Sequence, residues 1–167
     1  LSNVDLLPAE VAPLHDCAWR VLAADILATR TQPPFNAAAM DGYALHDADA
    51  HEGAELSVVG ESAAGRSFSS IVSPGECIRI FTGAPVPAGL TSVVMQEDVE
   101  LIESAGGKSV RCLDPVFPGE NVRRTGADLC RGQKILSPGD WLTAARIGLL
   151  ASQGLDTIEV AAVPRTA

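Results

Sequence analysis

The amino-acid sequence predicts a mainly β fold with two or three short helices. Short runs of β-favouring residues, bounded by Gly and Pro, fill the middle of the 167-residue chain, and helical spacing of apolar residues occurs only near its two ends. Hydrophobic residues make up 47% of the chain and aromatic residues only 4%, so we expect a core of Val, Ile, Leu and Ala. This composition is too apolar for a disordered protein.

The first expected element is a short helix over 13–25, where Asp16 can cap and apolar residues recur at helical spacing. Gln32-Pro33-Pro34 ends this region, because consecutive prolines fix φ and remove backbone donors. The segment that follows, from Pro33 to Ala44, is expected to be a loop.

The middle of the chain predicts β structure and the end predicts a second helix. The expected strands are 56–59, 77–81, 92–95, a hairpin of 99–103 and 109–113 around a Gly-rich turn, and 158–161. Thr143 is expected to cap a helix that Gly154 ends. These elements predict two domains: a helix-plus-strand stem of 1–31 and 129–167, and an inserted β-rich domain of 32–128.

The charge balance argues against several classes of partner. Twenty-one acidic and twelve basic residues give a net charge of -9, which repels nucleic acids and anionic membranes. No apolar run approaches the roughly 20 residues of a bilayer span, and the start of the chain lacks the pattern of a signal peptide. We therefore expect a cytoplasmic protein with no nucleic-acid and no membrane partner.

The cysteines and histidines do not form a recognisable metal or catalytic pattern. No two cysteines approach Cys-x-x-Cys spacing, so buried or incidental thiols are favoured over a zinc site. The histidines are scattered and are expected to be exposed loop residues. These residues are Cys17, Cys77, Cys112, Cys130, His15, His46 and His51.

Two segments combine residue types that suit a ligand, a cation in the first and an oxyanion in the second. Asp41-Gly42 places a carboxylate, a hard ligand for a cation such as magnesium, on a segment of small side chains. Thr82-Gly83 follows an expected strand and offers a hydroxyl and approachable backbone N–H groups, which suit an oxyanion. The structural alternatives are a simple turn at Asp41-Gly42 and an ordinary loop after the strand.

A third segment concentrates arginines next to a carboxylate. Arg123 and Arg124 precede Asp128, and arginine forks suit phosphate or molybdate-like oxyanions while a carboxylate can bind a metal. The alternative is a solvated surface on which the arginines pair with Asp128.

Taken in order, these segments resemble the MoeA family of molybdopterin molybdenumtransferases, which shares this region with gephyrin. The matching segments are Pro34-Phe35 with Met40-Asp41-Gly42-Tyr43-Ala44, Pro74-Gly75-Glu76 with 78–89, 93–97, 119–128, 147–154 and Pro164-Arg165. The resemblance implies the amino-terminal region of the family, which consists of two interlocked β-rich domains. Because the chain begins with Leu1 and ends at Ala167, we expect it to be part of a longer protein that continues with a molybdopterin-binding domain.

The resemblance also implies an activity in molybdenum cofactor biosynthesis. Family members insert molybdate into adenylylated molybdopterin with Mg²⁺-dependent release of AMP, and they act as homodimers, so this part alone is expected to be inactive. Asp41 and Asp128 are the candidate metal ligands. By similarity, the expected site residues are Asp41, Thr82 and Asp128 for catalysis and Gly42, Gly83, Arg123 and Arg124 for substrate binding.

The chain departs from the family pattern at three positions. Ala37 and Ala38 stand where the family usually has Asn and Ser, and Ala127 stands where it usually has Glu. These changes remove hydrogen-bonding side chains near Asp41 and one carboxylate near Asp128. The alternative function is a non-catalytic scaffold or dimerisation module, since the sequence shows no complete catalytic triad or metal cluster.

Overall fold

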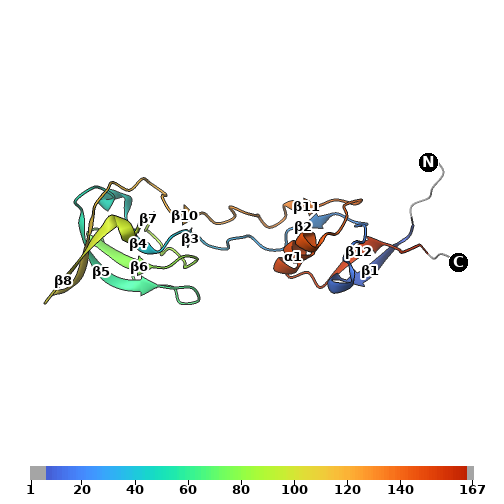
Figure 1. Cartoon of the computed structure of the whole chain (residues 1–167), viewed down its shortest axis with the longest axis horizontal. Coiled ribbons are helices and arrows are strands. Elements are labelled where there is room, and N and C mark those ends of the chain that lie inside the picture. The colour runs from blue at the N-terminus through green and yellow to red at the C-terminus, as the bar shows by residue number, and fades with distance from the viewer. Residues whose placement is uncertain (1–6, 165–167) are drawn as a thin grey trace. The chain divides into compact units, whose positions relative to one another are not determined.

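The structure of the chain, a computed structural model, describes residues 7–164 (Figure 1). Its strands are β1 (Ala9–Pro13), β2 (Ile26–Leu27), β3 (Ala37–Ala38), β4 (Gly42–Leu45), β5 (Glu55–Ser62), β6 (Glu76–Ile80), β7 (Ser92–Met95), β8 (Val99–Ser104), β9 (Gly107–Cys112), β10 (Val122–Arg123), β11 (Lys134–Leu136) and β12 (Thr157–Ala161). Its helices are α1 (Ala144–Ser152) and the short 3₁₀ turns η1 (Leu14–Asp16), η2 (Asp47–Asp49) and η3 (Gln96–Asp98). The expected mainly β fold with short helices is confirmed.

The chain divides into two compact units, each described below by itself. The first contains 1–31 and 128–167, and the second contains 32–127. The expected motif residue Arg165 and the first five residues of the chain lie outside the described part. Over residues 7–164, none of the helices combines the length and the apolar character that crossing a membrane requires.

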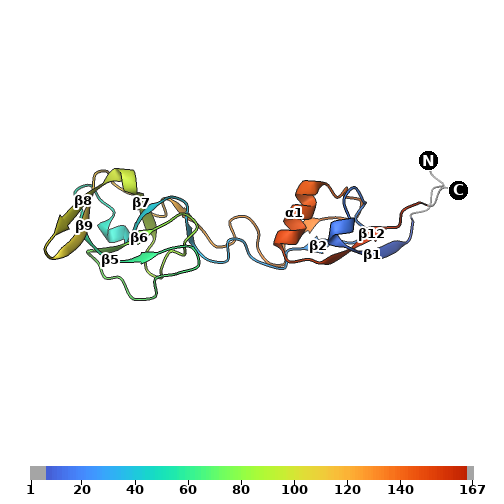
Figure 2. The ribbon, with the colours of Figure 1, turned by 60° about the horizontal axis from the view of Figure 1, so that its bottom comes forward.

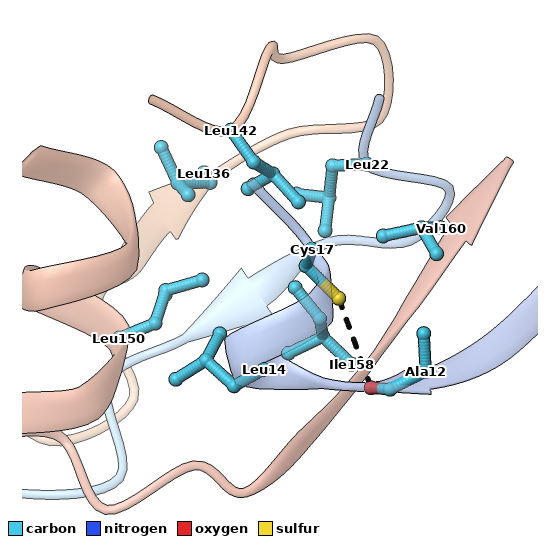
Figure 3. Close-up of a cluster of buried hydrophobic side chains, with 9 residues drawn as sticks. All are labelled: Ala12, Leu14, Cys17, Leu22, Leu136, Leu142, Leu150, Ile158 and Val160. Carbon is cyan, nitrogen blue, oxygen red and sulfur yellow. Dashed lines mark hydrogen bonds between the residues drawn. The ribbon is translucent and has the colours of Figure 1, made fainter. Parts of the chain in front are cut away.

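The first unit joins segments from both ends of the chain. β1 pairs antiparallel with β12, and β2 pairs antiparallel with β11. Figure 3 shows side chains of β1, η1, β11, α1 and β12 converging on one aliphatic core. The core residues are Ala12, Leu14, Cys17, Leu22, Leu136, Leu142, Leu150, Ile158 and Val160. Burial of each large aliphatic side chain contributes about 2 kcal/mol to the stability of this unit.

The helix expected near the end of the chain is confirmed. Thr143 precedes α1, and its side-chain oxygen accepts a hydrogen bond from the backbone nitrogen of Arg146 at 3.4 Å. Gly154 follows the helix with φ +77°, a left-handed conformation that glycine adopts without strain. The local signals for the start and the end of this helix were therefore sufficient to predict it.

The helix expected over 13–25 is wrong. Only η1 is helical there, and Trp19 adopts φ +66°, which no α-helix accommodates. The following backbone bonds to distant segments instead: Leu22 N–H donates to Asp140 O at 2.9 Å, and Ala23 N–H donates to Glu159 O at 2.9 Å. Because these partners offer the backbone inter-strand hydrogen bonds, tertiary pairing outweighs the helical spacing.

The second unit is built on a six-stranded sheet with the order β7-β4-β6-β5-β9-β8. β5 and β6 run parallel, and the other neighbours run antiparallel. Figure 2 shows β8 and β9 as a hairpin next to β5. The expected strands and the expected hairpin of this region are confirmed.

Both faces of this sheet carry a hydrophobic cluster. Successive residues of a strand point to opposite faces. Tyr43 and Leu45 accordingly belong to one cluster, and Ala44 belongs to the other together with Ile78 and Ile80. Because β4 lies between β6 and β7 and has both faces covered, all four of its residues are buried. The loop expected over this part of the chain is therefore wrong: Gly42–Leu45 is a central strand.

Candidate functional site

The segment from Asn36 to Asp41 is hydrogen-bonded along one side to the loop that follows β6. Gly83 N–H donates to Ala38 O at 2.8 Å, and Ala38 N–H donates to Ala84 O at 3.0 Å. Val86 N–H donates to Asn36 O at 2.8 Å. Two segments that the sequence singled out separately are thus hydrogen-bonded neighbours in space.

The same segment bonds on its other side to the arginine-containing segment. β3 pairs with β10 so that Arg123 lies opposite Ala37, and Ala39 N–H donates to Asn121 O at 2.8 Å. The backbone N–H and the hydroxyl of Thr125 both donate to Asn36 Oδ1, at 3.0 and 3.2 Å. The parts of the three candidate segments that contain Asp41, Thr82 and Arg123 therefore meet within the second unit.

Asp41 and Thr82 lie in direct contact at this meeting point. Gly42 pairs with Ile80 in the register of β4 and β6, which brings the residue before β4 close to the loop after β6. Thr82 donates two hydrogen bonds to Asp41 Oδ1, from its backbone nitrogen and from Oγ1, both at 2.8 Å. Both hydrogen-bond donors that residues 7–164 direct at this carboxylate bind Oδ1. The second carboxylate oxygen can therefore accept a hydrogen bond from a ligand or bind a cation.

Hydrogen bonding keeps the Asp41 carboxylate ionised. The backbone N–H of Thr82, then its hydroxyl, and then the charge of Arg79 hold the pKa of Asp41 below its ordinary value. Desolvation of the carboxylate raises the pKa and outweighs the contribution of Arg79, but the two Thr82 bonds keep the net shift downward. The site therefore presents a fixed negative charge at neutral pH.

Arg79 lies on β6 beside this pair. Its Nη1 donates to the carbonyl oxygen of Gly42 at 3.0 Å, and its Nη2 donates to Gln96 Oε1. The guanidinium carbon lies 5.2 Å from the ring centre of Tyr43 and 4.8 Å from that of Phe81. The guanidinium is thus held by hydrogen bonds and by two aromatic rings.

The two site glycines are required for different reasons. A Cβ atom on Gly42 would lie 1.8 Å from the carbonyl oxygen of Val94, because β7 packs against it. Gly83 has open space around it but adopts φ +80°. Packing of the sheet accounts for the first glycine, and the conformation of a turn accounts for the second. Their expected contact with substrate remains a prediction.

The backbone N–H groups around Gly83 bind protein oxygens. Thr82 N–H donates to Asp41, Gly83 N–H to Ala38 O, and Ala84 N–H to Phe81 O at 2.9 Å. The expectation that Gly83 leaves these N–H groups open to an oxyanion is therefore wrong. The loop's chemical contribution is its bond to Asp41.

The remaining expected residues are distributed over two surroundings. Arg124 lines a cavity of about 500 Å³ with Asn36, Thr91 and Thr125, and Arg123 is exposed. Asp128 is exposed and belongs to the first compact unit. The structure thus brings Asp41, Gly42, Thr82 and Gly83 together within the second unit. Asp128 belongs to the other unit.

The donor set of the described residues fits a weakly coordinated magnesium ion better than a tightly bound metal. Among residues 7–164, no three His, Cys, Asp or Glu side chains are close enough to surround one ion. Asp41 nevertheless offers one carboxylate oxygen to which none of the described residues donates. Mg²⁺ commonly takes one or two carboxylates and completes its shell with water and substrate phosphates, so this donor fits it.

The thiols and histidines take no part in this site. Cys17, Cys77 and Cys112 are buried, and Cys130 is exposed. Burial raises the pKa of Cys77 to about 12, which leaves its thiol protonated and unreactive.

His15 and His51 are exposed, as expected. His46 is only partly exposed, because a ring nitrogen lies 2.8 Å from Val72 O.

The departures from the family pattern at Ala37 and Ala38 have a packing explanation. Both residues are buried, at 6% and 1% exposure, and Ala38 belongs to the hydrophobic cluster that contains Ala44 and Ile78. Small apolar side chains therefore suit these two positions. Ala127 is exposed, and nothing in the structure explains the alanine there.

Two residues of this site, Arg79 and Gln96, were not predicted from the sequence. A signal was present, because Arg79 is a charged residue in the otherwise apolar run Cys77–Ile80. Gln96 gave no local signal, since its position depends on where β7 ends relative to β4. Only the register of the sheet brings these two side chains together.

Known proteins share this sequence and this fold. Molybdopterin molybdenumtransferase of Haemophilus influenzae is 36% identical over 150 residues, which cover 90% of this chain and 36% of that protein. Gephyrin of Dictyostelium discoideum is 32% identical over 161 residues, which cover 87% of this chain and 22% of that protein. The crystal structure of the molybdopterin biosynthesis MoeA protein of Pyrococcus horikoshii OT3 has a TM-score of 0.84 at 36% identity and covers 94% of this chain and 42% of that one.

The match to the family covers about as much of this chain as the matches to single relatives do. The chain spans less than half the length of each of these three relatives. Residues 1–154 match the family described as MoeA N-terminal region (domain I and II). The chain therefore belongs to the MoeA family and corresponds to its amino-terminal region.

Proposed function

We propose that this chain is the amino-terminal part of a molybdopterin molybdenumtransferase, which inserts molybdate into adenylylated molybdopterin and releases AMP. The observation that carries the proposal is the contact between Asp41 and Thr82, where the family's motif segments meet. The relatives' names supply the reaction class. The two compact units, 1–31 with 128–167 and 32–127, are proposed to be its domains.

The proposed roles follow from the charge of the reactants. Molybdate and the phosphoanhydride of the substrate are anionic, so Arg123 and Arg124 are proposed to bind an oxyanion. Asp41 is proposed to hold Mg²⁺ through its second carboxylate oxygen, with Asp128 as the other candidate ligand. When bound, Mg²⁺ supplies charge neutralisation at the phosphoanhydride.

Thr82 is proposed to orient the Asp41 carboxylate, because its two bonds fix one of the two oxygens. The backbone at Gly42 and Gly83 is proposed to lie against the substrate.

The whole protein is proposed to be a cytoplasmic homodimer. Because the chain covers 36% of the Haemophilus influenzae relative, we propose that the remaining domains complete the site and that residues 1–167 alone are inactive. Molybdopterin is the proposed small-molecule partner.

The test is cofactor synthesis by the full-length protein with molybdate, Mg²⁺ and adenylylated molybdopterin. Asp41→Ala, Thr82→Ala and Asp128→Ala are each expected to lower AMP release about 100-fold, as loss of a positioned charge or donor does. Glu52→Ala, which removes an exposed carboxylate of the same unit, serves as the control and is expected to keep wild-type activity. Full activity of all three site variants would contradict the assignment. A full-length protein that dimerises but releases no AMP would favour a scaffold.

A further inference from the structure

Arg79 lies on β6, between β4 and β5, and its side chain is partly exposed. Its neighbours Ile78 and Ile80 are fully buried and point to the other face of the sheet. Among residues 7–164 its guanidinium makes no salt bridge; a carbonyl, an amide and two aromatic rings hold it.

Two of these contacts reach a residue next to Asp41 or Thr82 in the chain. Gly42, whose carbonyl accepts from Nη1, directly follows Asp41. Phe81, whose ring stacks on the guanidinium, directly precedes Thr82.

Gln96 completes the connection. Its side chain accepts from Arg79 Nη2, and its backbone N–H donates to the carbonyl oxygen of Asp41 at 3.1 Å. Arg79 therefore links three segments of the sheet: the start of β4, the end of β6 and the end of β7.

From these contacts we infer that Arg79 is a positioning residue that holds Asp41 and Thr82 in reactive geometry through Gly42, Phe81 and Gln96. The inference rests on the proposed function for its catalytic consequence. Its structural content is that removal of Arg79 loosens the Thr82–Asp41 bonds.

The chemistry of these contacts requires arginine rather than lysine. A planar guanidinium donates from two nitrogens in fixed directions while its faces lie against aromatic rings. A lysine ammonium would keep the positive charge but could not donate to Gly42 and Gln96 in this fork geometry. The variant Arg79→Lys therefore separates the effect of charge from the effect of positioning.

The experiment uses four variants of the full-length protein: Arg79→Met, Arg79→Lys, Gln96→Ala and the control Arg66→Met. Arg66 forms an exposed ion pair with Glu61 in the same unit. The measurements are kcat, KM and the hydrogen-exchange rate of the Thr82 amide.

We expect Arg79→Met to lower kcat about 100-fold with little change in KM, as misplacement of reacting groups does. The Thr82 amide should exchange about fivefold to tenfold faster, since its acceptor is no longer held. Arg79→Lys should lower kcat and speed Thr82 exchange as Arg79→Met does, because lysine keeps the positive charge but not the two-nitrogen fork. Arg66→Met should match the wild type in all three measurements.

Gln96→Ala keeps the aromatic contacts of Arg79 and removes the bond to Nη2, together with the exposed bond from Gln96 Nε2 to Glu97 Oε1. If Arg79→Met fails to fold, this variant decides the question, with an expected loss in kcat of about tenfold.

The two proposals fail in different ways. If Asp41→Ala and Thr82→Ala abolish turnover while Arg79→Met and Gln96→Ala keep wild-type kcat and Thr82 exchange, the positioning role is overturned and the proposed function stands. If Asp41→Ala and Thr82→Ala leave turnover intact, the proposed function fails, and faster Thr82 exchange in Arg79→Met still supports the positioning role.

Discussion

Thr82 donates two hydrogen bonds to one oxygen of Asp41, although the two residues are 41 positions apart in the chain. The register of β4 against β6 creates this contact, because Gly42 lies opposite Ile80. The contact fixes the orientation of the carboxylate and lowers its pKa. The chemistry of the site therefore depends on the alignment of two central strands.

Replacing Thr82 with Val tests the hydroxyl bond separately from the backbone bond. The variant keeps the Thr82 N–H donor and the side-chain volume, so the fold should be unchanged. Loss of the hydroxyl donor is expected to raise the pKa of Asp41 towards its ordinary value of about 3.9. The measurement is a pH titration of the Asp41 carboxyl by NMR.

Thr91→Val is the matched control, because Thr91 donates to Asp47 instead. An unchanged Asp41 titration in Thr82→Val would contradict the role of the hydroxyl.

The stability difference between the wild type and Asp41→Asn should depend on pH. The pKa of Asp41 is lower in the folded state, so ionised Asp41 stabilises the fold at pH values above its unfolded pKa of about 3.9. This contribution should disappear as the pH falls through the lower folded pKa. Urea unfolding at pH 6 and at pH 3 should show a smaller difference between the two proteins at pH 3. If the difference in the free energy of unfolding grew towards acid pH, the lowered pKa of Asp41 would be contradicted.

Gly42→Ala should destabilise the second unit strongly. The added Cβ would lie 1.8 Å from the carbonyl oxygen of Val94 on the neighbouring strand β7, and backbone atoms of paired strands cannot move apart without breaking the sheet. We expect a loss of at least about 3 kcal/mol in the free energy of unfolding. Denaturant unfolding measures this loss. Gly106→Ala, where the nearest atom would be Ser104 Oγ at 3.7 Å, should cost less than about 1 kcal/mol and is the control.

Thiol labelling should distinguish one cysteine from the other three. Cys130 is exposed and should react with iodoacetamide in the folded protein, whereas Cys17, Cys77 and Cys112 are buried. Burial also raises the pKa of Cys77 to about 12, which suppresses its thiolate. Peptide mass analysis before and after unfolding in urea measures the labelled positions. Rapid labelling of Cys77 in the folded protein would contradict its burial.

Local sequence signals predicted the elements whose residues act alone or with close neighbours. The helix between Thr143 and Gly154 has its own cap and its own stop, and the hairpin of β8 and β9 closes through a short turn. Such elements depend on interactions within a few residues. The sequence also predicted that Asp41 and Thr82 are site residues, through the resemblance of their motifs to a family.

Long-range pairing decided the rest. Leu22 has helical spacing with its neighbours, yet its backbone bonds to Asp140, more than one hundred positions away. The segment that ends at Asp41 has the composition of a loop, yet it forms β3 between two partner segments. Neither partner can be identified from the segment itself, because inter-strand hydrogen bonds depend on which strands the whole fold brings together.

The amino-acid sequence by itself determined the mainly β class, the local elements with their own caps and turns, and the motifs that mark the family. Only the tertiary structure decided that Arg79 and Gln96 surround Asp41 and that Thr82 binds a single carboxylate oxygen. The physical reason is the register of the sheet: β4, β6 and β7 come from separate parts of the chain, and their alignment determines which side chains meet.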